Sequence, residues 1–104
     1  NAMCTGAPDY LRRSKKILQM VIEMHQQGKP VATICHGPWV LCSARIVKDV
    51  KVTSLVAIKD DLENAGAQWV DEAVVNDKNI ITSRHPKDLV PFTLELINAM
   101  LAKK

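Results

Sequence analysis

Residues 28–38 read GKPVATICHGP. Gly28 and Pro30 end any helix that precedes them, and residues 31–34 form a short β-branched run without polar alternation, which is typical of a buried parallel strand. The turn CHGP follows directly, and residues 39–45 return to helical character. A strand that enters a helix through a sharp turn is the repeating unit of a doubly wound α/β sheet. The stretch therefore predicts an α/β fold.

The flanking segments complete this prediction. Residues 9–27 keep apolar side chains at helical spacing, with Pro8 and Asp9 at the expected helix start. Residues 58–65 predict a short helix that ends at Gly66. Short strands are expected over 51–54, 69–70, 73–75 and 80–82, and residues 76–79 supply the turn of a hairpin between the last two. Residues 86–101 predict a closing amphipathic helix that buries Leu89, Phe92, Leu96, Ile97 and Met100 on one side.

Length and composition set broad limits. The chain has 104 residues, of which 47% are hydrophobic, 24% charged and 4% aromatic, which fits one domain over residues 1–104 with an aliphatic core. Asn1 and Ala2, before Met3, are typical of a tag remnant. No apolar run approaches a membrane span. The net charge of +3 is too small and dispersed to indicate nucleic-acid binding. The sparse cysteines favour reduced thiols in a cytoplasmic protein.

Cys35 is the strongest candidate for chemistry. A tight turn between strand and helix presents its central side chain at the carboxyl edge of the sheet, where α/β proteins bind ligands. The following helix start favours a thiolate, and the neighbouring His36 can accept its proton. Backbone N–H groups of the turn can hold a developing oxyanion, and Gly37 allows close approach of a backbone or substrate. Position alone leaves open that Cys35 is a small buried hydrophobe.

Other polar residues have simpler interpretations. His25 is expected to be a solvated residue near a helix end. His85 is expected to be a loop residue near the carboxyl edge of the sheet, with a substrate contact as the alternative. Asp60 and Asp61 diverge on a helix and fit its acidic start. Trp39 either lines a pocket or packs in the core, and Cys42 is expected to be buried and inert. No cluster of side chains has metal-ligand spacing, and no cofactor is predicted.

The chain resembles the ThiJ/PfpI family of intracellular proteases and amidases from about Ala7 to Leu101. The resemblance rests on separated motifs in the order of that family: residues 28–38, then IKDD at 58–61, NAG at 64–66, WVD at 69–71 and TSR at 82–84. It implies a flavodoxin-like, class I glutamine-amidotransferase-like three-layer sandwich. It also implies that Cys35 is the nucleophile and His36 the triad histidine.

The same resemblance assigns further residues. In hexameric members of the family, an acidic residue after Ala-Pro completes the triad across a subunit interface, and Asp9 occupies that position here. The alternative is that Asp9 is an ordinary acidic residue at a helix start. Gly37, Gly6 and Trp39 are the candidates for the oxyanion site and its pocket.

Family members begin with strand and helix units that this chain does not contain. A parallel strand over residues 31–34 needs neighbours on both edges, so we expect self-association, by dimerisation or strand exchange, or a truncated form of the family. The expected activity is hydrolysis of small peptides, amides or aldehyde-derived adducts. Two alternatives stay open: a stress-responsive or redox-responsive protein that uses an oxidisable Cys35, and an inactive truncated member.

Overall fold

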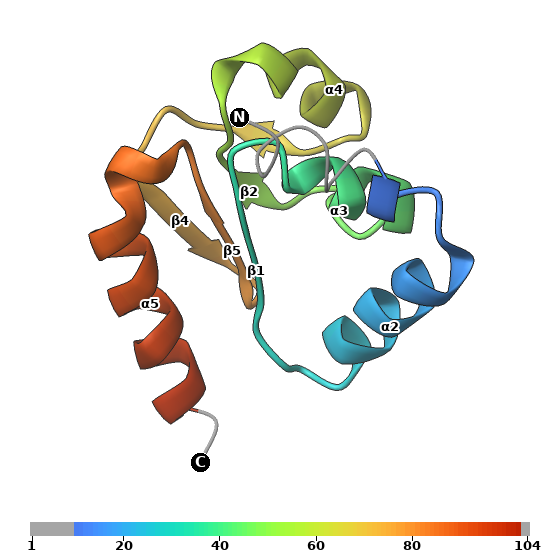
Figure 1. Cartoon of the computed structure of the whole chain (residues 1–104), viewed down its shortest axis with the longest axis horizontal. Helices are drawn as coiled ribbons and strands as arrows, with labels where there is room; N and C mark the ends of the chain where they lie inside the picture. The colour runs from blue at the N-terminus through green and yellow to red at the C-terminus, as the bar shows by residue number, and fades with distance from the viewer. Residues whose placement is uncertain (1–9, 103–104) are drawn as a thin grey trace.

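The computed structural model describes residues 10–102, which form a mixed α/β structure (Figure 1). The principal helices are α2 (Lys15–Gln26), α3 (Pro38–Ala44), α4 (Lys59–Asn64) and α5 (Leu89–Ala102). The strands are β1 (Val31–Ile34), β2 (Lys51–Val52), β3 (Gln68–Trp69), β4 (Val74–Asp77) and β5 (Ile80–Ser83). Short 3₁₀ turns over Val56–Ile58 and Pro86–Asp88 lead into α4 and α5. The predicted alternation of strands and helices is confirmed.

The main sheet has the order β1-β5-β4. Strand β1 runs parallel to β5, with Val31 opposite Ile80, and this confirms the parallel strand predicted over residues 31–34. Strands β4 and β5 form the predicted hairpin. Its turn is tighter than expected, because β4 continues to Asp77 and only Lys78 and Asn79 make the connection. Both have positive φ, 53° and 64°, as a type I′ hairpin turn requires.

A second, smaller sheet pairs β2 with β3 in parallel. Two polar contacts attach it to the main sheet. The backbone N–H of Thr53 donates to Thr82 Oγ1 over 2.8 Å, and that of Lys51 donates to Asp77 Oδ2 over 2.8 Å. These bonds join β2 and the residue after it to β4 and β5.

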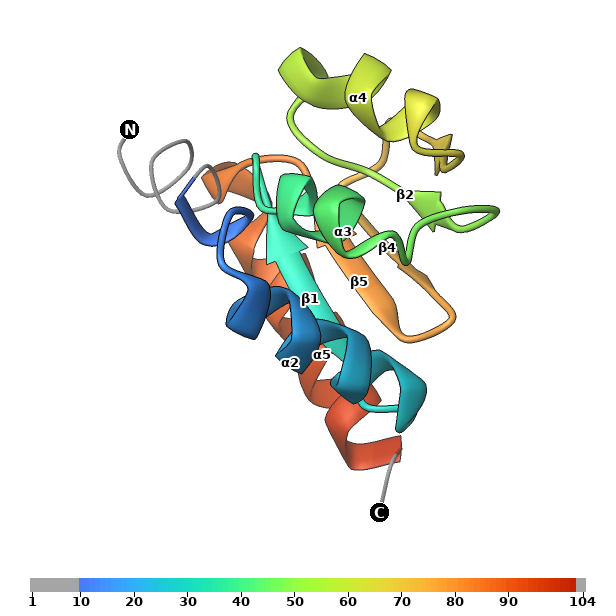
Figure 2. The ribbon, with the colours of Figure 1, turned by 90° about the vertical axis from the view of Figure 1, so that its right-hand side faces the viewer.

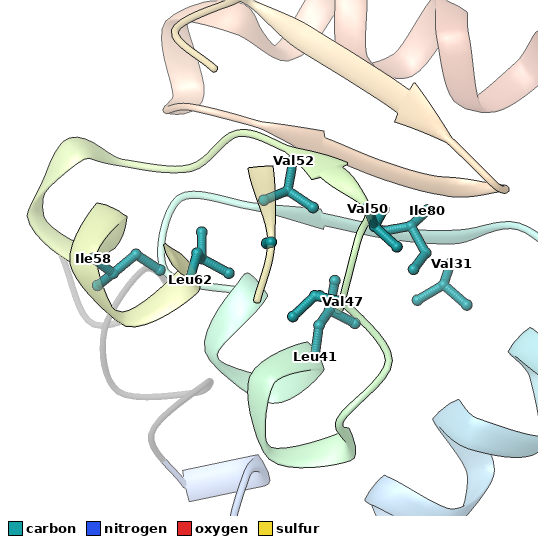
Figure 3. Close-up of a cluster of buried hydrophobic side chains, with 9 residues drawn as sticks. Val31, Leu41, Val47, Val50, Val52, Ile58, Leu62 and Ile80 are labelled. Carbon is teal, nitrogen blue, oxygen red and sulfur yellow. The ribbon is translucent and has the colours of Figure 1, made fainter. Parts of the chain in front are cut away.

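Helices cover both faces of the main sheet. Helix α5 lies along one face, and α2 and α3 lie on the other (Figure 1), while the view turned by 90° shows α2 and α5 flanking β1 (Figure 2). This three-layer arrangement buries one continuous aliphatic cluster beneath α3 and α4 (Figure 3). The cluster consists of Val31, Leu41, Val47, Val50, Val52, Ile58, Leu62, Ala67 and Ile80.

The helix boundaries differ from the prediction at the first helix. Helix α2 begins at Lys15, because Ser14 is its N-cap and accepts a hydrogen bond from the Ile17 N–H at 3.2 Å. Asp9, the expected helix start, lies outside the described residues. Helix α4 is followed by Gly66 with φ +94°, so the left-handed residue predicted at its end is confirmed.

The predicted buried face of the last helix is partly wrong. Ala99 is buried and Phe92 is half-buried, but Leu89, Ile97 and Met100 are exposed. Side chains at Val90, Leu94, Ile97 and Leu101 form an exposed row, which we call the α5 stripe. Their spacing of four, three and four residues places them on one side of the helix. Helix α5 is therefore apolar on its outer side as well as its inner side, as is typical of helices that pack on two neighbours.

One edge of β1 is also open within residues 10–102, since β1 pairs only with β5. The N–H groups of Val31 and Cys35 donate to carbonyls of Asn79 and Ser83. The backbone N–H groups of the alternate residues Ala32 and Ile34 therefore point to the open edge. An apolar groove of ≈ 430 Å³ runs along this edge between α2, β1 and α3. No helix of the described segment is long and apolar enough to cross a membrane.

Candidate functional site

Cys35 occupies the turn between β1 and α3 in a left-handed conformation, with φ 60°. A left-handed backbone costs a non-glycine residue roughly 1–2 kcal/mol, so the surrounding structure must hold it there. Two bonds do so: the Cys35 N–H donates to the Ser83 carbonyl, and the Cys35 carbonyl accepts from the Leu55 N–H, each at 3.1 Å. The residue is only 2% exposed. This is the geometry of a nucleophile elbow.

Gly37 makes the turn compact. A β-carbon at this position would lie 2.8 Å from Thr33 Cβ and 2.9 Å from the Ile34 carbonyl oxygen, closer than real contacts allow. Its φ is −51°, so glycine is required for space rather than for backbone freedom. The Gly37 N–H donates to the Ile34 carbonyl at 2.8 Å. That N–H is committed within the turn, which leaves it little capacity to bind an oxyanion.

His36 lies beside Cys35 and is 7% exposed. Its ring contacts that of Trp39, with centroids 4.9 Å apart and planes tilted by 57°. Its Nδ1 is buried and has no hydrogen-bond partner among residues 10–102. The backbone N–H of His36 donates to no carbonyl in the same part of the chain. Within residues 10–102, His36 thus has one uncommitted backbone donor and one uncommitted ring nitrogen, in the residue that follows the thiol.

Trp39 connects the elbow to neighbouring segments of the chain. Its Nε1 donates to Asp61 Oδ2 at 2.9 Å, and the Arg12 guanidinium lies 5.5 Å from its ring. The indole also packs against the aliphatic core. Trp39 lines neither the cavity beside the elbow nor the groove along α2. It therefore orients His36 and joins α3 to α4, and Asp61 is its partner at the start of α4.

A cavity of ≈ 340 Å³ lies beside the elbow, where three strands end. Its walls come from the segments that follow β2, β3 and β5, and the lining residues are Ser54, Leu55, Val56, Trp69, Asp71, Arg84 and His85. Leu55 is bonded to the Cys35 carbonyl, and Arg84 directly follows Ser83, which is bonded to the Cys35 N–H. Cys35 itself does not line the cavity, but a residue bonded to its carbonyl and the residue after Ser83 do. Sequence reasoning missed it, although TSR and WVD were among the recognised motifs.

Arg84 is the electrostatic centre of this cavity. Its Nε and Nη2 donate to the two carboxylate oxygens of Asp88 at 2.9 and 3.3 Å, and its Nη1 donates to Asp71 at 3.0 Å. The hydrogen bond from Arg84 lowers the pKa of Asp88, and the bonds from Asp88 and Asp71 raise the pKa of Arg84. His85 Nδ1 lies 3.7 Å from Asp88 Oδ2. His85 is thus at the carboxyl edge of the sheet, as expected, and lines the cavity.

The remaining candidates lie apart from this centre or outside the described residues. Cys42 is half-buried, and burial is the main cause that raises its pKa to about 11. His25 sits near the end of α2 and is less solvated than expected, since its Nδ1 is buried. Gly6 and Asp9 lie outside the described residues. Within residues 10–102, no group of three or more His, Cys, Asp or Glu side chains is arranged to hold a metal ion.

Comparison with known proteins assigns the chain to a family. The model of the DJ-1/PfpI family matches residues 5–99. A deglycase of Thermococcus kodakarensis is 46% identical over 94 residues, which cover 90% of this chain and 57% of that protein. Protein/nucleic acid deglycase 2 of Escherichia coli is 40% identical over 95 residues, covering 90% of this chain and 55% of that protein. The chain spans a little over half the length of these relatives.

Solved structures agree with this placement. A two-domain protein of Anabaena variabilis, with DJ-1/ThiJ/PfpI-like and ferritin-like domains, matches with a TM-score of 0.89 and 44% identity over 90% of this chain and 27% of that one. DJ-1beta of Drosophila melanogaster matches with a TM-score of 0.83 and 29% identity, over 88% of this chain and 50% of that one. The fold is that of the flavodoxin-like DJ-1/PfpI structures, as the resemblance implied.

Proposed function

Because the chain belongs to the DJ-1/PfpI family, we propose that it takes part in cysteine-dependent hydrolysis of deglycase or amidase type, with Cys35 as the nucleophile. The observation that carries this proposal is the left-handed Cys35, held by its backbone between the ends of β1 and β5 and the segment after β2. Relatives named as deglycases support the reaction class. A reduced thiol of this kind suits the cytoplasm, where we place the activity.

The elbow suggests how each group acts. With an amide substrate, the proton of Cys35 passes to the His36 ring and the thiolate adds to the amide carbonyl carbon. The carbonyl electron pair moves to oxygen, where the backbone N–H of His36 stabilises the negative charge. The His36 ring then gives a proton to the departing nitrogen, the carbon–nitrogen bond breaks, and an acyl thioester remains on Cys35. Water attacks the thioester, which releases the acid and restores the thiol. In this scheme the committed N–H of Gly37 has no part.

Asp9 is proposed as the acid that orients His36 from a neighbouring copy of the chain. What supports this is the buried His36 Nδ1, which lacks a hydrogen-bond partner among residues 10–102 and can donate to a carboxylate once protonated. The open edge of β1 and the α5 stripe support self-association in general, because both leave apolar or hydrogen-bonding surface exposed. We expect the assembled form to be the active one.

The proposal is tested by turnover of several substrates with variants of two cysteines. Methylglyoxal-treated N-acetyl amino acids report deglycase activity, and aminomethylcoumarin peptides report amidase activity. Cys35→Ala is expected to abolish turnover, while Cys42→Ala retains it, because burial keeps the thiol of Cys42 protonated. Turnover that survives in Cys35→Ala, or that is lost only in Cys42→Ala, contradicts the assignment.

A further inference from the structure

The cavity beside the elbow combines an apolar wall with a single cationic group. Leu55, Val56 and the Trp69 indole supply the apolar part, and Arg84 is the only Lys or Arg among its lining residues. A volume of ≈ 340 Å³ falls at the small end of ligand-binding cavities and admits a metabolite-sized group. The cavity is thus suited in size and chemistry to a small molecule with an aliphatic part and an anionic end.

Arg84 is held in place for such a role. Asp88, whose side chain is 11% exposed, binds its Nε and Nη2 in a two-pronged contact. This contact fixes the plane of the guanidinium. The group has five N–H donors in total, and its remaining nitrogen, Nη1, is not bound to Asp88. A rigid guanidinium with donors left over is the group that proteins use most often to bind carboxylates.

The contact of Nη1 is of a different kind. Its partner, Asp71, has a side chain that is 72% exposed. An exposed ion pair is weak, because water screens both charges and competes for both partners. A carboxylate that enters the cavity would meet the same nitrogen next to the apolar wall. Asp71 therefore occupies a position that a ligand carboxylate can take over.

We propose that the cavity is the substrate-binding pocket for the reaction at Cys35, and that Arg84 selects substrates with a carboxylate near the reacting carbonyl. The substrate class is then a small carboxylic acid, such as a modified or amide-bearing amino acid, with its aliphatic portion against Leu55 and Trp69. Asp71 competes with that carboxylate and weakens its binding. The inference rests on the proposed function, since it specifies the substrate of the same site.

The test compares two alkylating reagents of nearly equal size, of which iodoacetate is anionic and iodoacetamide is neutral. The Cys35 thiolate displaces iodide from iodoacetate or iodoacetamide and forms a thioether, so only the carboxylate or amide differs. Peptide mapping by mass spectrometry gives the rate at Cys35 separately from those at Cys4 and Cys42. The rate with iodoacetate is divided by the rate with iodoacetamide in the folded chain. This ratio is then divided by the same ratio for Cys35 in urea, which cancels the intrinsic reactivity of the two reagents.

The proposal predicts a normalised ratio well above one in the wild-type chain. Asp71→Asn is expected to raise it further, because the competing carboxylate is gone. Arg84→Gln is expected to lower it about ten-fold, which corresponds to about 1.4 kcal/mol. Asp71→Asn changes only an exposed side chain, so it tests the proposal even if Arg84→Gln fails to fold. Gln19→Glu, on the exposed side of α2, controls for a general change of charge.

The outcomes separate this inference from the proposed function. A ratio near one that neither Asp71→Asn nor Arg84→Gln changes overturns carboxylate selection and leaves the nucleophile in place. A ratio that falls in Asp71→Asn overturns the assigned role of Asp71 and with it the proposal. If Cys35 reacts with neither reagent, while Cys42 does, the proposed function itself is contradicted.

Discussion

The backbone of Cys35 carries a strain that its substitution can measure. With φ 60°, the position favours glycine over any residue with a β-carbon. Both Cys35→Gly and Cys35→Ala remove the thiol, so their difference isolates the backbone. We expect Cys35→Gly to be the more stable by about 1 kcal/mol in urea unfolding, the reverse of the usual order. An alanine variant as stable as the glycine variant would show that the elbow is unstrained.

Cys42 makes a second prediction at the scale of one residue. Burial raises its pKa to about 11, so at pH 8 about one thiol in a thousand is ionised. Its alkylation by iodoacetamide should therefore be slow at pH 8 and should rise about ten-fold per pH unit until the pH approaches 11. Site-resolved mass spectrometry measures this rate. A rate at Cys42 that levels off below pH 9 would contradict the protective effect of burial.

Between elements, the contact of Arg84 with Asp88 joins the end of β5 to the start of α5. The hydrogen bond from Arg84 lowers the pKa of Asp88, so the contact stabilises the fold at neutral pH and is lost as the pH falls through that lowered value. Asp88→Asn should lower the midpoint of urea unfolding at pH 7. The difference from wild type should shrink below pH 4. A difference that is constant from pH 7 to pH 2 would refute this linkage.

The passage from β1 to α3 depends on a glycine for steric reasons. Gly37→Ala would place its β-carbon 2.8 Å from Thr33 Cβ and should destabilise the fold by about 1–3 kcal/mol. Gly66→Ala, after α4, is the comparison: its cost comes from φ +94° and should be about 1 kcal/mol. Chemical unfolding measures both. If Gly37→Ala costs less than Gly66→Ala, the close packing of the turn is not limiting.

At the scale of helices and strands, the sequence predicted those features that depend on a few neighbouring residues. The β-branched run over residues 31–34 and the left-handed Gly66 were found because strand and cap preferences act over a few residues. The single helix predicted over residues 9–27 was wrong because the chain turns at residues 12 and 13 and Ser14 then caps a new helix. The cavity around Arg84 was missed because its walls come from three segments distant in sequence, which only the sheet brings together.

For the whole molecule, the α5 stripe predicts association. Replacing Leu94 and Ile97 together by Glu should shift the chain toward monomer, because both side chains are exposed and apolar within a continuous row. Glu at both Gln19 and Gln26, which are exposed polar positions on α2, adds the same charge away from the stripe and should leave the mass unchanged. Light scattering after size exclusion gives the mass. A wild-type chain that is a well-folded monomer would remove the basis for this prediction.

A shared active site makes a further prediction for the assembly. If Asp9 serves the His36 of a neighbouring copy, Cys35→Ala and Asp9→Asn chains should each be inactive or nearly so. When they are mixed, unfolded and refolded together, mixed assemblies contain sites with both wild-type residues, and activity should return in part. Activity that stays at the sum of the separate variants would place Asp9 outside the triad or within the same chain.

Trapping a covalent intermediate shows whether Cys35 is the nucleophile. Acid quenching during turnover, followed by peptide mapping, locates any acyl group bound to the chain. With an aminomethylcoumarin peptide as substrate, we expect an acyl thioester on Cys35 that forms and decays during turnover, is present in Cys42→Ala and is absent in Cys35→Ala. Turnover without an adduct on Cys35, or an adduct on Cys42 instead, would contradict it.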